Sequence, residues 1–219
     1  MTPADPADPA DPAATAPRLS RERIVATALE LIDRDGLGAV TMRRIADELG
    51  VQAPSLYNHM RSKDALLDAV AESVMQQVDA SAFDGPDWRA ALDAWAWSYY
   101  EALVAHPNLI PHLAVAFGRL DVALARADQV FAGLRRAGWT PSRATRISAA
   151  VRYAVYGAAL GSFAGGFPAD AARFPHLRDI DQLREQPQRV DRAALKLLID
   201  RFLVGLDAIA PEVTAPAGP

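Results

Sequence analysis

The placement of the prolines is the feature that most constrains how this chain can fold. Of its 16 prolines, eight lie in the first 17 and the last nine residues, and the other eight lie at the ends of segments with helically spaced apolar residues. Proline is tolerated in the first turn of a helix but breaks its interior. No segment shows sustained apolar–polar alternation with β-branched residues, so no sheet is expected. The predicted fold is therefore all-α.

Apolar spacing and capping residues predict where the helices begin and end. The first runs from an N-cap at Ser20 to Asp35, and Gly36 supplies the left-handed stop. Two short helices follow, one from Met42 to Leu49 and one from about Pro54 to Met60. A fourth begins after Ser62 and carries apolar residues as far as Val78. The remaining segments predicted as helices are 87–105, 109–117, 120–137, 141–164 and 191–209, with a loop over 165–190.

Charge and composition divide the 219 residues into four parts. Residues 1–17 repeat Ala-Asp-Pro and carry three acidic groups, which predicts a disordered tail. Residues 18–63 carry eight basic and six acidic groups, a net charge of +2, and the rest of the chain brings the total to −4. The predicted domains are a helix-turn-helix unit over 18–63 and a helical regulatory and dimerisation domain over 64–210, followed by a disordered tail over 211–219.

Several classes of protein are disfavoured by what the chain lacks. It has no cysteine, which excludes a thiolate metal site and a cysteine nucleophile. It contains no nucleophile elbow, zinc motif, phosphate loop or dinucleotide fingerprint, so it is not expected to be an enzyme. Its most apolar uncharged stretch, Tyr153 to Phe167, is fifteen residues long, short of a membrane span, and no secretory signal opens the chain. A cytoplasmic protein without a membrane partner is expected.

Residues 41–60 have the pattern of a helix-turn-helix, two short helices joined by a turn containing glycine. The spacing turns Leu56 and Met60 inward and leaves a set of small, hydroxyl, amide and ring side chains outward. The outward residues are Ala53, Ser55, Tyr57, Asn58 and His59. Side chains of these kinds contact base edges and phosphates, and the arginines and lysine near them, Arg43, Arg44, Arg61 and Lys63, suit phosphates.

The same pattern has a second interpretation. Glycine-containing helix pairs occur as ordinary packing in many all-α proteins, and a basic excess of two charges does not decide the matter. A helical scaffold or ligand-binding module without DNA activity is therefore the alternative to a DNA-binding protein. It predicts no sequence-specific footprint on DNA.

Three segments together resemble the TetR family of bacterial transcriptional regulators. They read ALELIDRDGL at 28–37, VTMRRIADELGV at 40–51 and PSLYNHMRSKDALLDA at 54–69. The resemblance implies that one set of residues faces the major groove, namely Arg43, Ala53, Pro54, Ser55, Tyr57 and Asn58. It places a second set at the phosphates, namely Thr41, His59 and Lys63.

Beyond residue 80 the resemblance is architectural and implies a regulatory domain that dimerises and holds an inducer. The segment 66–71 and His112-Leu113 resemble the tetracycline-repressor branch, in which a histidine at the position of His112 binds a metal carried by the drug. Here apolar residues follow His112, and Val78 and Asp79 stand where that branch has histidines. Metal-bound tetracycline, a metal site and a cofactor are therefore not expected.

Aromatic residues in the second half predict a pocket for a small molecule, because apolar pockets between helices commonly hold ligands. Most of these aromatic residues would also serve simply as core. The candidate effector-binding residues are Trp95, Tyr99, Tyr100, His112, Phe117 and Tyr153. They suit an uncharged to weakly polar aromatic or polycyclic effector.

A glycine at every fourth position, at 157, 161 and 165, predicts a bare helix face that another backbone approaches closely. With the last helix, this face is expected to form a four-helix dimer seam that includes Gly157, Gly161, Leu198 and Phe202. A contact within one chain is the alternative. In a two-fold dimer the two recognition helices would lie ~34–36 Å apart on a pseudo-palindromic operator. The predicted function is a ligand-responsive repressor that leaves this operator when the effector binds.

Overall fold

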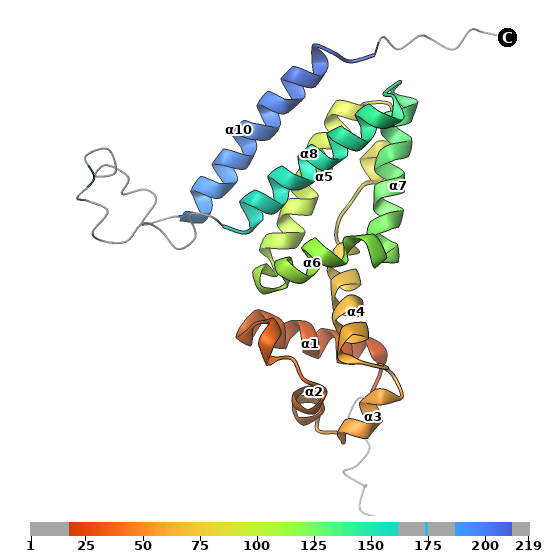
Figure 1. Ribbon diagram of the computed structural model, residues 1–219, viewed down its shortest axis with the longest axis vertical. Coiled ribbons are helices and arrows are strands. Elements are labelled where there is room, and N and C mark those ends of the chain that lie inside the picture. The colour runs from red at the N-terminus through yellow and green to blue at the C-terminus, as the bar shows by residue number, and fades with distance from the viewer. Residues whose placement is uncertain (1–17, 162–173, 175–186, 212–219) are drawn as a thin grey trace, which may run out of the picture.

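The computed structural model describes residues 18–161, 174 and 187–211, and within these residues the secondary structure is entirely helical (Figure 1). The α-helices are α1 (Arg21–Asp35), α2 (Met42–Leu49), α3 (Ala53–Tyr57), α4 (Lys63–Met75), α5 (Trp88–Val104), α6 (Ile110–Ala116), α7 (Asp121–Arg136), α8 (Pro141–Ala159) and α10 (Pro187–Asp207). Short 3-10 helices occur at Leu37–Ala39, Ser81–Asp84, Pro107–Leu109 and Phe117–Arg119. The all-α prediction is confirmed for the described residues.

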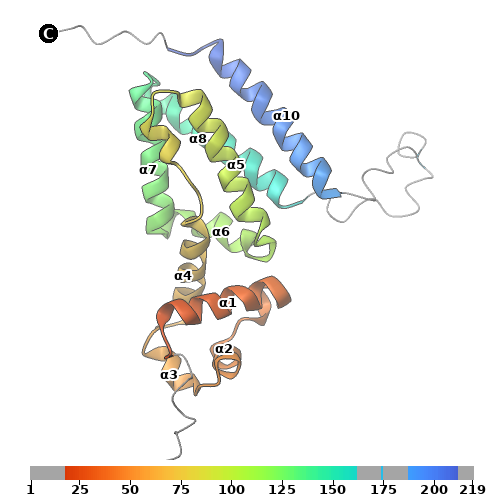
Figure 2. The ribbon, with the colours of Figure 1, turned by 180° about the vertical axis from the view of Figure 1, so that it is seen from behind.

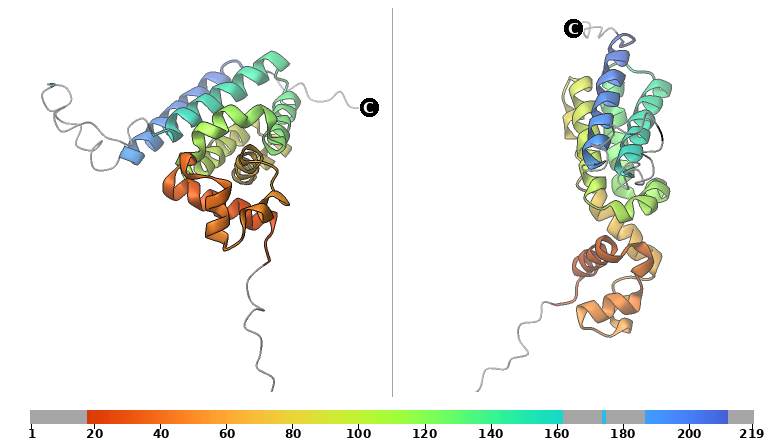
Figure 3. Two further views of the ribbon diagram at one scale, coloured as in Figure 1. Left: turned by 60° about the horizontal axis from the view of Figure 1, so that its bottom comes forward. Right: turned by 90° about the vertical axis from the view of Figure 1, so that its left-hand side faces the viewer.

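The helices form a small unit and a larger one, joined by α4. Figures 1 and 2 show α1, α2 and α3 gathered at one end of the molecule, with α4 running from them into the remaining helices. In the larger unit α8 packs against α5, α7 and α10, and α10 is the outermost helix (Figure 3). Because α4 contacts α1 on one side and α5, α6 and α7 on the other, it is packed against both units.

Hydroxyl side chains cap the starts of four helices, and the sequence predicted the first three of these caps. The hydroxyl oxygens of Ser20, Thr41, Ser62 and Thr140 each accept a hydrogen bond from the backbone N–H three residues later, at 3.1 to 3.3 Å. These bonds satisfy amide donors that the helix itself cannot pair. At the other end of α2, Gly50 takes the left-handed conformation, with φ 67°, which ends the helix and turns the chain toward α3.

Three predicted helix ends were wrong by three to five residues. The third helix ends at Tyr57 rather than Met60, although the amide of Met60 still donates to the carbonyl of Leu56 at 2.8 Å. Helix α4 ends at Met75, so Val78, although buried, belongs to the segment that follows the helix. Helix α8 ends at Ala159, and Gly161, with φ 62°, lies beyond the helix rather than on its face.

The expected loop over 165–190 falls mostly outside the described residues. Its last four residues, 187–190, are helical and begin α10, because Pro187 is accepted in a first helical turn. The two predicted tails and Gly165 also lie outside the described residues, apart from Pro211.

A single hydrophobic cluster extends from α1 to α10 and holds the small unit against the large one. Two polar contacts at this junction add to it. His106 Nδ1 lies 2.8 Å from a carboxylate oxygen of Asp33 at the end of α1, and the amide of Asn108 donates to the carbonyl of Ile32 at 3.0 Å. The short helical segment after α5 therefore positions α1, and with it α2 and α3.

Candidate DNA-binding surface and ligand cavity

Helix α3 is positioned by two buried side chains on one of its faces. Leu56 is fully buried and Met60, just after the helix, is 1% exposed, as the sequence spacing predicted. The amide of Val51 donates to the carbonyl of Ala46 at 2.9 Å, which fixes the turn between α2 and α3. The inward face of α3 is thereby pinned to α1 and α2, so its other face is directed away from the molecule.

That outward face is polar and free of acidic residues from 53 to 63. Tyr57 is 52% exposed, Asn58, His59 and Pro54 are exposed, and Ala53 and Ser55 are half-buried. Thr41 and Arg43 are exposed at the start of α2, and Lys63 is half-buried at the start of α4. The nine residues predicted to contact DNA therefore all have at least partial exposure, on the unit that forms one end of the molecule (Figure 1).

The two neighbouring arginines of α2 differ in their partners. Arg44 forms an ion pair with Asp35, and Arg34 pairs with Glu48 at 2.5 Å, so these two acidic groups are matched by cations of the same unit. The hydrogen bond from Arg34, with further attraction from Arg44, holds the pKa of Asp35 below its usual value. Arg43 makes no ion pair with any described residue, so of the two it is the one open to an external anion.

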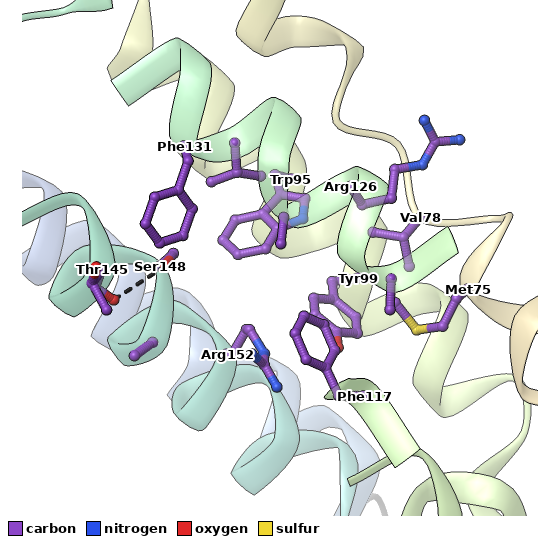
Figure 4. A pocket seen from close by; sticks show the side chains of 14 residues that line it. Met75, Val78, Trp95, Tyr99, Phe117, Arg126, Phe131, Thr145, Ser148 and Arg152 are labelled. Atoms are coloured by element: carbon purple, nitrogen blue, oxygen red, sulfur yellow. Dashed lines mark hydrogen bonds between the residues drawn. The ribbon is translucent and has the colours of Figure 1, made fainter. Parts of the chain in front are cut away.

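A cavity of about 240 Å³ lies among α5, α7 and α8 (Figure 4). Its wall is mostly apolar, with a few hydroxyl and guanidinium groups. The lining residues are Met75, Val78, Trp95, Tyr99, Phe117, Ala123, Arg126, Ala127, Val130, Phe131, Thr145, Ser148, Ala149 and Arg152. Because Met75 ends α4 and Val78 follows it, the cavity also touches the helix that leads to the small unit.

Three of the six residues predicted to hold an effector line this cavity, namely Trp95, Tyr99 and Phe117. The other three lie elsewhere. Tyr100 faces α10, from which the guanidinium carbon of Arg192 lies 5.9 Å from the centroid of its ring, and His112 Nε2 lies 3.0 Å from Asp68. Tyr153 is 76% exposed, because successive residues of a helix point in directions about 100° apart and its neighbour Arg152 points inward.

The sequence analysis missed the polar residues of the cavity, Arg126, Thr145, Ser148 and Arg152. One signal was available for Arg152, which is the only charged residue between 147 and 169. Ser148 and Arg152 are also four apart, so they share a helix face. Which face that is depends on how α5 and α7 pack against α8.

The polar groups of the cavity are held in a largely desolvated setting. The Tyr99 hydroxyl donates to the Tyr156 hydroxyl at 3.2 Å, and burial raises the pKa of Tyr99 far above its usual value, so it remains protonated. The Arg152 guanidinium lies over the ring of Phe117, 3.4 Å from its centroid. The Nε atoms of Arg126 and Arg152 are both buried without a hydrogen-bond partner.

Asp68 connects α4, which leads from the small unit, to the segments beside the cavity. It accepts hydrogen bonds from Arg119 at 3.0 Å and lies 3.0 Å from His112. Partial burial raises the pKa of Asp68, but the bonds from Arg119 and His112 outweigh this and lower it overall. His112 thus has a carboxylate partner, and the described residues contain no group of three His, Cys, Asp or Glu side chains that could hold a metal ion.

The outer faces of α8 and α10 expose several large apolar side chains. These are Tyr153, Leu160, Leu197, Leu198 and Val204. Gly157 is exposed, and a Cβ added there would meet no atom within 4 Å, while Phe202 is half-buried. Of the four residues predicted at a dimer seam, Gly161 alone lies outside a helix. None of the helices among the described residues is long and apolar enough to cross a membrane.

The chain is similar in sequence to known regulatory proteins of one family. The model of bacterial regulatory proteins of the tetR family matches residues 24–70. An HTH-type transcriptional regulator of Saccharopolyspora erythraea is 35% identical over 65% of this chain, and the class C tetracycline repressor of Escherichia coli is 36% identical over 65%. The chain spans 61% and 66% of the lengths of these two relatives.

Solved structures extend the similarity over most of the chain. A possible TetR family transcriptional regulator from Streptomyces coelicolor is 31% identical, with a TM-score of 0.70 over 87% of this chain and 100% of the other. A TetR variant from Acinetobacter baumannii in complex with minocycline is 25% identical, with a TM-score of 0.65 over 89% of this chain and 100% of the other.

Proposed function

Because the chain belongs to the tetR family of bacterial regulatory proteins, a family of regulators and not of enzymes, we propose that it is a ligand-responsive repressor of transcription. Helix α3 reads an operator, and the cavity holds the small molecule that releases it. The observation that carries the proposal is the division of α3 into a buried apolar face and an exposed polar face without acidic residues. The expectation that the chain is not an enzyme is confirmed by its family.

The exposed side chains of α3 have the chemistry for reading DNA. Tyr57 and Asn58 offer a ring, a hydroxyl and an amide to base edges, and Ser55 offers a further hydroxyl. Ala53 and Pro54 at the start of the helix leave room for close approach to the major groove. Thr41, Arg43, His59 and Lys63 lie around this surface and contact phosphates, which fixes the orientation of α3 on the duplex.

A second copy of the chain covers the exposed apolar side chains of α8 and α10. Large contiguous apolar surfaces are uncommon on monomers and mark association sites. Pairing α8 and α10 with their symmetry mates forms a four-helix seam that includes Gly157, Leu198 and Phe202. The dimer then presents two α3 helices to two half-sites of a pseudo-palindrome.

Release from the operator passes through α4. This helix begins at Ser62 beside α3 and ends at Met75 in the cavity wall, and Asp68 ties its middle to α6 and Arg119. An effector that binds the cavity better in one position of α4 shifts the dimer toward that position. The minocycline bound by the Acinetobacter baumannii relative supports a small-molecule effector in this family.

Selection of bound sequences from random duplexes tests the DNA-binding function directly. The purified full chain is expected to enrich one sequence with two inverted half-sites and to protect it in a footprint. A chain that enriches no sequence and gives no footprint would show that the helical scaffold or ligand-binding module is the correct interpretation.

Tyr57→Ala tests the assignment of α3. We expect specific binding to weaken by about tenfold or more, since a contact to a base edge contributes about 1–3 kcal/mol. The unfolding temperature should stay the same because the side chain is exposed. Undiminished operator affinity would refute the assignment.

Arg43→Ala and Arg44→Ala form a matched pair for the phosphate contacts. Losing Arg43 should reduce the slope of log affinity against log salt by about 0.9, because one phosphate is no longer neutralised. Losing Arg44 should change this slope less, since its guanidinium already pairs with Asp35. Equal changes in the two variants would contradict the distinction.

Leu198→Glu tests the dimer face. The charge should convert the dimer to a monomer in sedimentation experiments and abolish binding to the two-half-site operator, while the helical content of each chain is retained. Val115→Glu is the control, because Val115 is an exposed apolar residue on α6, 73% exposed against 49% for Leu198. If the Leu198→Glu variant is still a dimer, the interface lies on another face of the molecule.

A further inference from the structure

We propose that the cavity selects an anionic aromatic ligand, one that carries a carboxylate or similar acid group, and that Arg152 is the residue that recognises the charge. The inference rests on the proposed function, since it names the chemical class of the effector. It differs from the uncharged or weakly polar molecule that the aromatic residues alone suggest.

Arg152 is placed so that its charge faces the interior of the cavity. Figure 4 shows its side chain extending from α8 toward Phe117 and Tyr99, between the two aromatic rings and Ser148. Its guanidinium carbon lies 3.4 Å from the centroid of the Phe117 ring, and its Nε is buried without a hydrogen-bond partner. The planar donors of this group match a carboxylate, which accepts two parallel hydrogen bonds.

Among the described residues no anion compensates this cation. The residues that line the cavity include no Asp or Glu, and Arg152 makes no ion pair with any described residue. An arginine does not lose its proton at any physiological pH, so it cannot escape the cost of burial by becoming neutral. The stacking on Phe117 offsets part of this cost, and an acidic ligand offsets far more.

Arg126 provides a contrast within the same cavity wall. Figure 4 shows its guanidinium pointing away from Phe117 and Arg152. Its charge also contributes to lowering the pKa of Asp79, so it has a carboxylate of the protein within electrostatic reach. Of the two arginines in the wall, Arg152 is therefore the one whose charge is available to a ligand.

The rest of the wall suits a flat apolar body attached to the acid group. Trp95 and Phe131 line the cavity away from Arg152, and Tyr99 lies on the side toward which Arg152 extends (Figure 4). A cavity of about 150 Å³ is enough to hold benzene. The volume of about 240 Å³ here therefore accommodates a second fused ring.

Two probes of nearly the same shape test the charge preference. The probes are 2-naphthoate, which is ionised at neutral pH, and 2-naphthamide, which is not. In calorimetric titrations of the full-length chain, we expect the acid to bind about tenfold more tightly than the amide, as is typical of a charge-assisted hydrogen bond in a desolvated site. Equal affinities, or tighter binding of the amide, would overturn the inference.

Three variants assign the preference to one residue. Arg152→Met keeps the length of the side chain and should bring the two affinities to within about twofold of each other, while Arg152→Lys retains part of the preference. Arg126→Met, the matched control, should leave the preference intact. A preference that survives in Arg152→Met, or that is lost equally in Arg126→Met, would show that Arg152 does not recognise the charge.

The experiment separates this inference from the proposed function. Folding of each variant is checked by its unfolding temperature and its affinity for the selected operator. If 2-naphthoate binds more tightly than the amide and Arg152→Met removes this difference in affinity, the inference holds. If the bound acid nevertheless fails to release DNA, the proposed mode of release is refuted while the inference stands. If both probes bind equally and release DNA, the proposed function stands and the inference fails.

Discussion

The surface of α3 and the cavity of the larger unit both offer cations to an anionic partner, but they are built in opposite ways. At α3 the apolar residues Leu56 and Met60 lie beneath a polar face that is open to solvent. In the cavity a mostly apolar wall borders the half-buried Arg152, whose Nε is buried without a hydrogen-bond partner. Solvated cations bind many anions weakly and with strong salt dependence, whereas a desolvated cation distinguishes sharply between ligands with and without charge. Each region therefore suits a different partner, a long DNA duplex in one and a small acid in the other.

The two regions are also supported differently. Helix α3 has only five residues and depends on the packing of a few side chains within the small unit. The cavity wall is drawn from α5, α7 and α8, which have sixteen to nineteen residues each. Substitutions beneath α3 and substitutions around the cavity, although within one continuous core, are expected to affect the two functions separately.

Leu56→Ala should cause the largest loss of stability and function, and the function lost should be DNA binding. Removing a fully buried leucine costs about 2–5 kcal/mol and leaves α3 without its anchor. We expect loss of operator binding, with 2-naphthoate binding in the larger unit retained. Chemical unfolding and calorimetry measure the two effects. A variant that loses both activities together would show that the two regions unfold as one unit.

Gly133→Ala is the counterpart on the cavity side. An added Cβ would lie 2.6 Å from Cδ1 of Phe83, whose ring packs edge-on against Trp95 in the cavity wall. Such overpacking costs about 1–3 kcal/mol, and 2-naphthoate binding should weaken while operator binding is retained.

Gly205→Ala is the control for this substitution. A Cβ there would meet no atom within 4 Å, so the helix α10 should become more stable by about 0.5–1 kcal/mol. Destabilisation of the two variants by equal amounts would rule out the contact with Phe83 as the cause.

Ser62→Ala tests the junction between the two regions. Its hydroxyl caps α4 by accepting from the amide of Ala65 at 3.1 Å, and losing such a cap costs about 1 kcal/mol. The first turn of α4 lies beside α3, so operator affinity should fall more than 2-naphthoate affinity. An equal fall in both affinities would indicate that the cap stabilises the whole molecule rather than this end of it.

Arg119→Ala should have the smallest effect on stability, and the effect should appear only at acidic pH. The pKa of Asp68 is lowered in the folded chain, so its ion pairs add stability above its usual pKa, and this contribution is lost as the pH falls through the lower folded value. Without Arg119 the pKa of Asp68 rises, and acid unfolding should begin at a higher pH. Arg146→Ala, on an exposed residue of α8, is expected to leave the acid transition unchanged.

Local rules predicted the DNA-binding unit more accurately than the cavity. Ser20, Thr41 and Gly50 set the ends of α1 and α2 as expected, because a cap acts on backbone groups only two to four residues away. The burial of Leu56 and Met60 followed from their spacing of four. The end of α3 was not predicted, because neither Asn58 nor His59 is a residue type that forces a helix to end.

For the cavity, sequence patterns identified Trp95, Tyr99 and Phe117 but not their polar neighbours. Aromatic residues on one helix face are equally consistent with core and with a pocket wall. Tyr100 and Tyr153 do not line this cavity, since which neighbour covers a given helix face depends on segments far away in the chain. Tyr100 turned out to face α10, from which Arg192 lies over its ring at 5.9 Å.

By itself the sequence determined the helical class, the helix starts and the polar outer face of α3, because these depend on interactions between residues a few positions apart. The tertiary structure alone decided that Arg152 points into an apolar cavity and that Arg44 is engaged by Asp35 while Arg43 is not. Whether a charge is solvated, paired or buried depends on which distant segments pack around it. The free energy of an ion changes far more with that setting than with its neighbours in the chain.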